Sequence, residues 1–286
     1  MNILVTGRKG YISSSLAESL RTKGHTVKQI SIRSKINEAE LSNVEVIIHC
    51  AAMVHKKEKN YSLEEYERVN HKKTVELASL AKEQGVRLFI FMSTMSVYGA
   101  SQGIITETTP LKPSTFYGIS KLHAEESLLS MEDNNFGVAI IRPPMVYGHQ
   151  APGNYQSLSK LAKVTPIFPI VKNQRSMIYI ENLIEFISQV VDFGDNGVFH
   201  PQNEEYVQTS EMVRQIANYH GKRIHFSSLL GYILMSLLGS RKIVNKVFGD
   251  LFYSKTLSDY RGNSYQTISF KESISQSEKS IINKGV

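Results

Sequence analysis

The first residues of the chain constrain its fold more than any other part. Ile3-Leu4-Val5 is a short apolar run that stops at Gly7, and apolar residues then recur at helical spacing from Ile12 to Leu20. A short strand that passes through a glycine turn into a helix is typical of the start of a βαβ unit. Gly10 would let the backbone approach a pyrophosphate at the N-terminus of that helix.

The glycine turn departs from the usual dinucleotide-binding pattern at its third position. Its spacing is Gly7-x-x-Gly10-x-x-Ser13, so a serine stands where a third glycine is common. A purely structural turn is the alternative interpretation, because a lone motif of this kind is a weak signal. Its place directly after the N-terminal strand favours dinucleotide binding.

Strands and helices alternate through the first half of the chain. We expect further strands at 26–32, 44–48, 86–92 and 138–141, and helices at 63–82 and 114–131. Strands separated by helices of this length predict an α/β fold, a Rossmann doubly wound parallel sheet. After residue 144 the pattern loosens into proline- and glycine-rich segments with short helices. We therefore expect a dinucleotide-binding domain over 1–150, with a return around 173–200, and a smaller α/β C-terminal substrate-binding lobe over 151–286.

Composition and charge narrow the class of protein. A single cysteine, Cys50, suits a reducing cytosol, so we expect a cytoplasmic protein. The apolar run 229–238 is too short to span a bilayer and is expected to pack as a core helix. The net charge of +7 is scattered and lacks an aromatic-rich basic stripe, so nucleic acid is not an expected partner. No pattern predicts a metal site, and a homodimer remains open.

A tyrosine and a lysine four residues apart, Tyr117 and Lys121, follow the strand that ends at Thr94. On a helix this spacing places both side chains on one face. A free tyrosine has a pKa of about 10, and a neighbouring ammonium is expected to move that pKa towards the working range. The same ammonium could hydrogen-bond the ribose hydroxyls of a nicotinamide cofactor. The alternative is an exposed helix pair, with Thr94 as a strand-end cap.

Several ordered segments together resemble one family. They are TGRKGYI (6–12), HCAA (49–52), Asn70, STMSVYG (93–99), Tyr117 with Lys121, RPPMVYG (142–148), RSMIYIENL (175–183) and ISFKESI (268–274). The chain is similar to extended short-chain dehydrogenase/reductases of the NAD-dependent epimerase/dehydratase family. Within that family it most resembles bacterial polysaccharide-pathway enzymes that act on UDP-linked 4-keto-6-deoxy-N-acetylhexosamines.

The resemblance implies roles for particular residues. Thr94, preferred over Ser93, would hold the reacting oxygen, with Tyr117 and Lys121 as the other catalytic residues. The residues implied in substrate binding are Thr94, Ser96, Asn154 in a loop after the fifth strand, and Arg175 as the anchor of the nucleotide diphosphate. His55 is a weaker candidate for the sugar. The family often has asparagine where this chain has Met145, which removes one expected polar contact.

The choice of cofactor depends on the end of the second strand. NAD binding usually requires an acidic residue there, but the chain reads Gln-Ile-Ser-Ile-Arg-Ser over 29–34. Arg33 or Arg8 could pair with a 2′-phosphate, although both could equally be solvated surface residues. We favour NADP(H), with NAD(H) as the alternative. The expected cofactor-binding residues are Gly7, Arg8, Lys9, Gly10, Tyr11, Ile12, Ser31, Arg33, Ala51, Ala52, Met53, Tyr117, Lys121, Pro143 and Pro144.

Three functions are compatible with this pattern. The first is an NADPH-dependent reductase of a 4-keto UDP-sugar, giving UDP-N-acetylquinovosamine or UDP-N-acetylfucosamine. The second is a nucleotide-sugar 4-epimerase with tightly bound NAD, and the third is a non-catalytic dinucleotide sensor. The intact Tyr117 and Lys121 pair argues against the sensor. The missing carboxylate favours the reductase over the epimerase.

Overall fold

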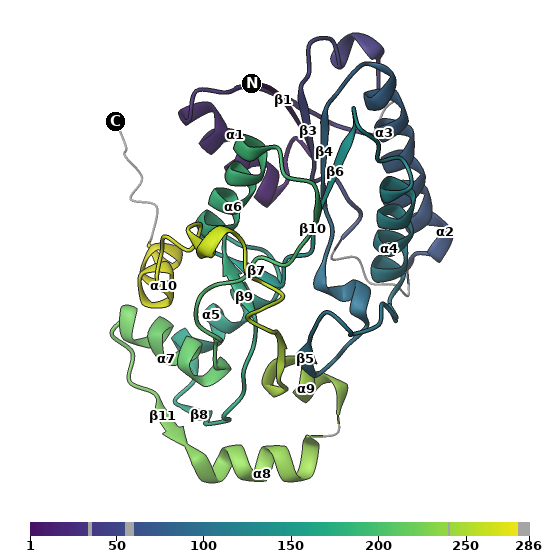
Figure 1. Ribbon diagram of the computed structural model, residues 1–286. Coiled ribbons are helices and arrows are strands. Elements are labelled where there is room, and N and C mark those ends of the chain that lie inside the picture. The colour runs from purple at the N-terminus through teal and green to yellow at the C-terminus, as the bar shows by residue number, and fades with distance from the viewer. Residues whose placement is uncertain (34–35, 55–59, 240, 280–286) are drawn as a thin grey trace.

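A computed structural model describes residues 1–33, 36–54, 60–239 and 241–279. Its centre is a six-stranded parallel sheet with the strand order β10-β6-β4-β3-β1-β2 (Figure 1). The strands of this sheet are β1 (Asn2–Thr6), β2 (Thr26–Ile30), β3 (Val46–His49), β4 (Leu88–Met92), β6 (Gly137–Ile141) and β10 (Gly197–Phe199). The predicted doubly wound parallel sheet is therefore confirmed.

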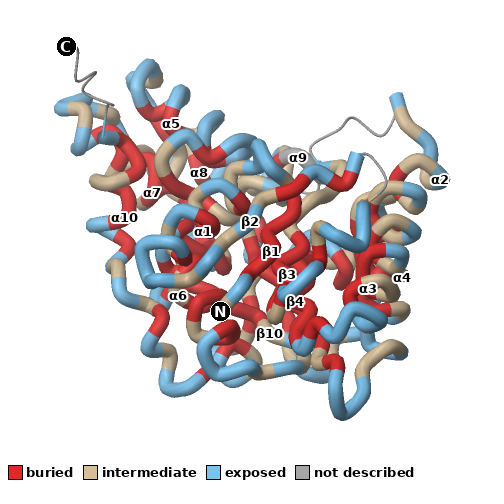
Figure 2. Tube along the Cα trace, turned by 90° about the horizontal axis from the view of Figure 1, so that it is seen from above, coloured by how far each residue is buried: buried red, intermediate tan, exposed pale blue. Residues whose placement is uncertain are grey.

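Helices cover both faces of the sheet, so its central strands are buried (Figure 2). One face carries α1 (Tyr11–Thr22) and α6 (Ile180–Phe193), and the other carries α3 (Lys73–Glu83) and α4 (Phe116–Leu129). Alternate residues of β1 serve the two layers: Ile3 and Val5 pack with the first pair of helices, and Leu4 packs with the second. Because both faces of the strand are covered, its three central positions are all apolar.

The predicted long helix 63–82 is helical throughout but changes its geometry along the way. It consists of α2 (Leu63–Tyr66), a π-helical segment (Glu67–Lys72) and then α3. Ser62 begins it with a capping box, since its side chain accepts from the backbone of Glu65 and the Glu65 side chain accepts in return. The π-helical segment places one buried polar residue, Asn70, towards the interior.

The order of the strands creates the position for a site. β1 pairs with β2 on one side and with β3 on the other, so the chain reverses direction across the sheet at β1. In doubly wound sheets the crevice beside the carboxyl ends of such strands receives the ligand. The residues that follow β1, β3, β4 and β6 all emerge at this edge.

The C-terminal lobe consists of short elements below the sheet (Figure 1). Three parallel strand pairs occur there: β7 (Met145–Tyr147) with β9 (Met177–Tyr179), β8 (Ile167–Pro169) with β11 (His225–Ser227), and β5 (Gly103–Ile105) with β12 (Leu251–Tyr253). The helices are α5 (Asn154–Val164), α7 (Thr209–Tyr219), α8 (Ser228–Leu238), α9 (Lys242–Phe248) and α10 (Phe270–Glu278). Between these elements, α6 packs against α1 and β10 joins the main sheet.

Two expectations for this lobe are wrong. Asn154 is not in a loop but begins α5, because Gly153 with φ +92° turns the chain into the helix. The apolar run 229–238 forms α8 as expected, but only Gly231 of that helix is buried. An apolar run indicates a tendency towards burial. Whether the helix is buried depends on whether the topology places another element over it. No helix in the described part of the chain combines the length and the apolar character needed to cross a membrane.

Candidate active site

The glycine turn after β1 is held closed by the serine at its third position. The Gly10 amide donates to the Gly7 carbonyl at 2.8 Å. The buried Ser13 hydroxyl lies within hydrogen-bonding distance of the Gly7 carbonyl and, at 3.1 Å, of the Gly10 carbonyl. A Cβ on Gly10 would lie 2.7 Å from Ser13 Oγ, and Gly7 has φ +96°, so neither glycine position accepts a side chain without adjustment.

The predicted cofactor residues of this turn lie where a pyrophosphate could approach. Arg8 and Lys9 are exposed, and Tyr11 and Ile12 open α1. A backbone cradle that a Cβ would fill, at the N-terminus of a helix, fits a dinucleotide. The Tyr11 hydroxyl is buried without a hydrogen-bond partner in the described chain, and burial raises its pKa far above the usual value.

His49 joins three elements beneath the crevice. Its Nδ1 lies 2.9 Å from Thr6 Oγ1 in β1, and its Nε2 lies 3.0 Å from Thr74 Oγ1 in α3. Thr74 donates its own proton to the Asn70 carbonyl, so the His49 Nε2–H is the donor in the second contact. Burial, with the charge of Lys121 as a smaller cause, lowers the pKa of His49 to about 3. It is therefore a neutral packing residue.

The segment after β3 is fixed by hydrogen bonds to its neighbours. Thr6 Oγ1 accepts from the Ala51 amide at 3.1 Å. Asn70 holds Met53 on both sides, accepting from its amide at 2.6 Å and donating to its carbonyl at 3.1 Å. Ala51, Ala52 and Met53 are half-buried, and the two alanines are small enough to leave room for a bound adenosine. Cys50 is inert here, since burial raises the pKa of its thiol to about 12.

Asn70 also connects this segment with the helix of the tyrosine and lysine. Its amide donates to Ser120 Oγ at 3.1 Å, and Ser120 Oγ donates to the Tyr117 carbonyl at 3.0 Å. The sequence marked Asn70 only as a matching residue and assigned it no role. Its role depends on the π-helical segment, and no local pattern predicted that segment.

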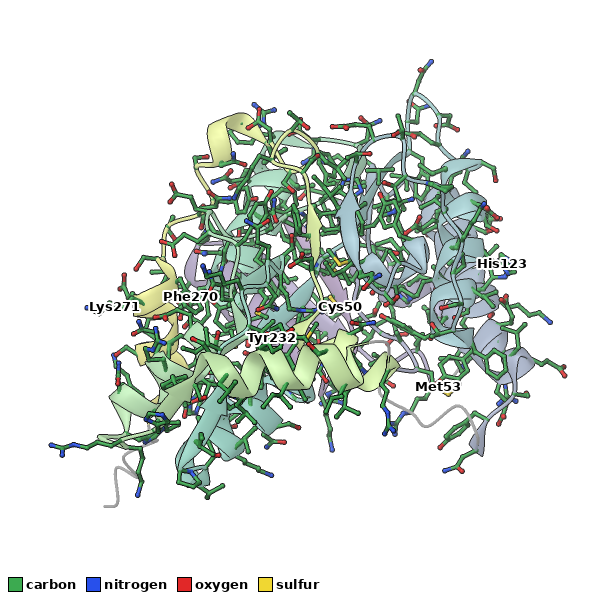
Figure 3. The ribbon with its side chains drawn as sticks, turned by 90° about the horizontal axis from the view of Figure 1, so that it is seen from below. Cys50, Met53, His123, Tyr232, Phe270 and Lys271 are labelled. Carbon is green, nitrogen blue, oxygen red and sulfur yellow. The ribbon has the colours of Figure 1, made fainter. Side chains whose placement is uncertain are left out.

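The structure brings Thr94, Tyr117 and Lys121 together. Tyr117 and Lys121 lie one turn apart on α4, and the Tyr117 hydroxyl hydrogen-bonds the Thr94 side chain. Lys121 is 1% exposed, and its Nζ lies 3.7 Å from the centroid of the Phe91 ring. Cys50, labelled in Figure 3, directly follows β3, and its thiol and Lys121 interact electrostatically.

The expectation that Lys121 lowers the pKa of Tyr117 is wrong for this structure. Burial raises the pKa of Tyr117 to about 12, and the hydrogen bond from Thr94 opposes that shift only in part. Burial also lowers the pKa of Lys121 to about 7, against the opposing effect of Glu125. Each group is removed from water, so the charged form of each is disfavoured. Tyr117 is therefore a protonated phenol, ready to donate, across the neutral range.

Thr94 and its neighbour Ser93 point to different partners. Ser93 is buried and donates to Glu125. Thr94 faces Tyr117 and also caps the short 3-10 helix Met95–Tyr98, since its Oγ1 accepts from the Ser96 amide at 3.1 Å. Thr94 is therefore a strand-end cap that also contacts Tyr117, and its catalytic role stays a prediction. The exposed Ser96 lies beside it, with the two hydroxyls 3.2 Å apart.

A buried charge pair lies behind these residues. Arg142 Nη2 donates to Glu125 Oε2 at 2.6 Å, and Arg142 Nη1 donates to Tyr98 Oη at 2.9 Å. Tyr98 Oη also lies 2.7 Å from Nε2 of His200, a histidine whose pKa burial lowers to about 3 and which is therefore neutral. We call Ser93, Glu125, Arg142, Tyr98 and His200 the support network. The sequence contained one sign of it, Arg142 in the RPPMVYG segment.

The outer cofactor residues lie at the end of β2 and beyond β6. Ser31 and Arg33 are exposed, and the Lys73 ammonium donates to the carbonyls of residues 32 and 33 at 2.6 and 3.0 Å. No carboxylate occurs in the described part of this strand end, residues 26–33. Pro143 and Pro144 are buried, and the Pro143 carbonyl accepts from the Met95 amide at 3.0 Å.

The predicted substrate residues of the lobe are separate from the three predicted catalytic residues. Arg175 is half-buried, donates to the Gly249 carbonyl at 2.7 Å and has its pKa lowered by burial. Asn154 is exposed on α5. In the described part of the chain, no hydrogen bond joins either residue to Tyr117. His55 lies outside the described residues.

Among the described residues one group could hold a metal ion, Glu67 with His71 and His123. Each histidine Nδ1 lies 2.8 Å from a separate Glu67 oxygen, and His71 Nε2 lies 2.9 Å from Ser127 Oγ. These distances are those of hydrogen bonds, and they satisfy the carboxylate without an ion.

The parallel sheet, the glycine cradle, the half-buried Tyr117 and the buried Lys121 define a class: a dinucleotide-dependent enzyme on a Rossmann scaffold. The sequence profile of the NAD dependent epimerase/dehydratase family matches residues 3–204. A UDP-glucose 4-epimerase of Vibrio cholerae is 33% identical over 248 residues, 76% of this chain and 75% of that protein. The chain belongs to the NAD-dependent epimerase/dehydratase family.

Further comparisons agree with this assignment. A dTDP-4-dehydrorhamnose reductase of Mycolicibacterium smegmatis is 28% identical over 221 residues, 70% of this chain and 64% of that protein. The solved structure of MoeE5 in complex with UDP-glucose and NAD is similar in fold, with a TM-score of 0.71, 22% identity and 97% of each chain covered. Epimerases and reductases thus both occur among the similar proteins.

Proposed function

We propose that the protein reduces the 4-keto group of a UDP-2-acetamido-2,6-dideoxy-hexos-4-ulose with NADPH, in the synthesis of precursors for a surface polysaccharide. The product is UDP-N-acetylquinovosamine or UDP-N-acetylfucosamine. The observation that carries the proposal is the Tyr117 hydroxyl, hydrogen-bonded to Thr94 and one helical turn from Lys121.

The roles of the three residues follow from their chemistry. The nicotinamide, when bound, supplies the hydride for carbon 4. Thr94 holds the ketone oxygen by a hydrogen bond, and Tyr117 donates its proton to that oxygen as negative charge develops. Lys121, in its ammonium form, binds the ribose hydroxyls and stabilises the phenolate that remains. The phenolate then regains a proton from solvent, so each turnover consumes one hydride and one proton.

The preference for NADPH rests on the end of β2. NAD requires an acceptor for the adenosine ribose hydroxyls, whereas a 2′-phosphate requires cations. Arg33 is exposed at this strand end, and Lys73 donates to its carbonyl at 3.0 Å. Arg8, exposed in the glycine turn, is a further cation for the phosphate.

The substrate is placed by the lobe below the sheet. Arg175 presents a guanidinium that burial makes costly to hold charged without an anion, and a diphosphate would supply that anion. Asn154 and Ser96 are further polar groups for the nucleotide or the sugar. Binding at the remote diphosphate would position the carbonyl for both hydride and proton.

A second candidate function is a UDP-hexose or UDP-N-acetylhexosamine 4-epimerase with a tightly held NAD. The 33% identity with the Vibrio cholerae epimerase favours it. An epimerase would return the hydride to the opposite face of carbon 4 and use the same three residues. It would need firm ribose contacts at the end of β2, where the described residues 26–33 contain no carboxylate.

One incubation separates the two candidates. Purified protein is mixed with NADPH and the UDP-4-keto sugar, the loss of NADPH absorbance is recorded, and the product is identified by NMR. The reductase predicts one NADPH oxidised per 4-hydroxy product formed. Interconversion of UDP-N-acetylglucosamine and UDP-N-acetylgalactosamine without NADPH loss would contradict the reductase and support the epimerase.

A further inference from the structure

Helix α8 presents apolar side chains to solvent. Leu229 is 69% exposed, Tyr232 73%, Ile233 42% and Leu237 74%. At 100° per residue these four lie on the side of the helix opposite Gly231, the one buried position. A surface helix of a globular protein normally has the reverse pattern, with its apolar stripe towards the core and its polar residues outside.

The attachment of α8 explains why this face stays uncovered. Gly231 sits so close to the backbone of residue 170 that an added Cβ would lie 1.9 Å from its carbonyl oxygen. The helix is thus fastened along one side, next to β8, and lies across the underside of the lobe (Figures 1 and 3). Figure 3 shows α8 nearest the viewer from below, with Tyr232 on it. Neighbouring elements add exposed apolar residues, Val164 at 78% and Ile167 at 44%.

The chain segment that contains this face carries charge of a single sign. No acidic residue occurs between Glu211 and Asp250, whereas six basic residues do: Arg214, Lys222, Arg223, Arg241, Lys242 and Lys246. Lys222 and Arg223 precede α8, and Arg241 and Lys246 follow it; all four are exposed. The apolar face is therefore bordered by cations at both ends.

We propose that α8 docks the protein on the surface of a membrane that contains anionic lipids. An apolar helix face with flanking lysine and arginine lies in the plane of the bilayer interface, where the apolar side chains enter and the cations meet the headgroups. The 11 residues of α8 are too few to span a bilayer, which needs about 20. Tyr232 suits the interface, because its ring is apolar and its hydroxyl can remain in the headgroup layer.

A second copy of the chain fits this face less well. Pairing two α8 helices in either direction would bring the basic flanks of one copy beside those of the other. The segment from 212 to 249 offers no carboxylate to offset that repulsion. Anionic lipid supplies the missing negative charge.

The chain contains no tryptophan, so one substitution creates a unique fluorescent probe. Tyr232→Trp is mixed with vesicles of phosphatidylcholine alone or of phosphatidylcholine with about one third phosphatidylglycerol. We expect a blue shift of the emission and quenching by brominated lipid with the anionic vesicles, both weakened by high salt, which screens the attraction between cations and headgroups. Leu129→Trp is the control, because Leu129 ends α4 shortly before β6 begins, at the opposite edge of the sheet, and is 37% exposed. Its emission should not shift.

Flotation of the otherwise unaltered protein supplies the second measurement. We expect the protein to float with the anionic vesicles. The double variant Leu229→Asp with Leu237→Asp should reduce the bound fraction roughly tenfold or more, because two charges would enter the apolar layer. The control variant Leu129→Asp should leave the bound fraction unchanged. An unchanged melting temperature and NADPH affinity would show that the double variant is folded. Failure of the parent protein to float, or binding of the Tyr232→Trp variant without a shift of its emission, would overturn the proposal. So would dimerisation through α8 without vesicle binding, seen by light scattering.

Discussion

Two groups of polar side chains each include residues of α4, and they differ in how fully their members are partnered. In the support network, Glu125 accepts hydrogen bonds from Ser93 and from two nitrogens of Arg142, Nε and Nη2. The third nitrogen of Arg142, Nη1, donates to Tyr98. In the predicted catalytic group, the Tyr117 side chain has Thr94 as its partner in the described chain, and Lys121 lies over an aromatic ring with its pKa lowered to about 7. Glu125 lies one turn beyond Lys121 on the same helix.

The difference indicates what each group is for. A buried ion pair that is fully hydrogen-bonded is fixed in one geometry, and removing one partner leaves a costly lone charge. The half-buried phenol and the buried amine have few partners and pKa values far from their usual ones, which is typical of groups that react or meet a ligand. We infer that the support network fixes the end of β4 and the start of the 142–148 segment. We also infer that Tyr117 and Lys121 gain their further partners from cofactor and substrate.

The largest expected effect is on chemistry alone. Tyr117→Phe should lower kcat by roughly 10²- to 10⁴-fold, because it removes the proposed proton donor and little volume. NADPH affinity, measured by fluorescence titration, and the free energy of unfolding should change little. A variant that retains most of the parent rate would exclude Tyr117 as the donor.

The opposite result is expected in the support network. Glu125→Ala should lower the free energy of unfolding by about 3–5 kcal/mol, since Arg142 would remain buried without its carboxylate. Glu185→Ala is the matched control, because it breaks the Lys23–Glu185 pair, in which both side chains are about one third exposed, and should cost about 1 kcal/mol or less. Urea unfolding monitored by circular dichroism measures both. Equal losses would show that the network is not a structural unit.

The sequence predicted the sheet and its crevice well, because their signals are local. Each of these signals lies within a few residues: the apolar strands that alternate with helices, the Gly7 turn, and the spacing of Tyr117 and Lys121. Asn70, Glu125 and Arg142 could not be assigned in this way, because their partners are far away in the chain. The exposure of α8 could not be predicted either, since an apolar run does not show whether another element packs over it. The pKa of Tyr117 was misjudged because burial outweighs its neighbours.

A smaller effect should separate the two cofactors. Arg33→Ala should weaken NADPH binding by roughly 1.5–3 kcal/mol, the usual loss of a charge-assisted hydrogen bond, and leave NADH binding nearly unchanged. The same comparison applies to Arg8→Ala. Calorimetric titration with each nucleotide gives the values. If both variants bind NADPH as tightly as the parent, the assignment of a 2′-phosphate site is wrong.

The smallest effect concerns pH and sharpens the contrast between the two groups. Lys121 is a base whose pKa in the folded protein is lowered from 10.5 to about 7, so its ammonium form is lost as the pH rises through 7. The pKa of Tyr117 is about 12, so the proton donor stays protonated across the neutral range. If the ammonium is needed for cofactor binding, kcat/KM should be level below the pKa of Lys121 and fall about tenfold per pH unit above it.

Lys121→Arg is the control for this profile, because a guanidinium remains charged throughout the range. We expect lower activity but a level profile between about pH 6 and 9. Glu125 raises the pKa of Lys121, so a folded Glu125→Gln variant should move the decline to lower pH. A decline that persists unchanged in Lys121→Arg would assign the titration to another group. A shift with Glu125→Gln would show that the support network, besides holding the backbone, sets the charge of the catalytic lysine beside it.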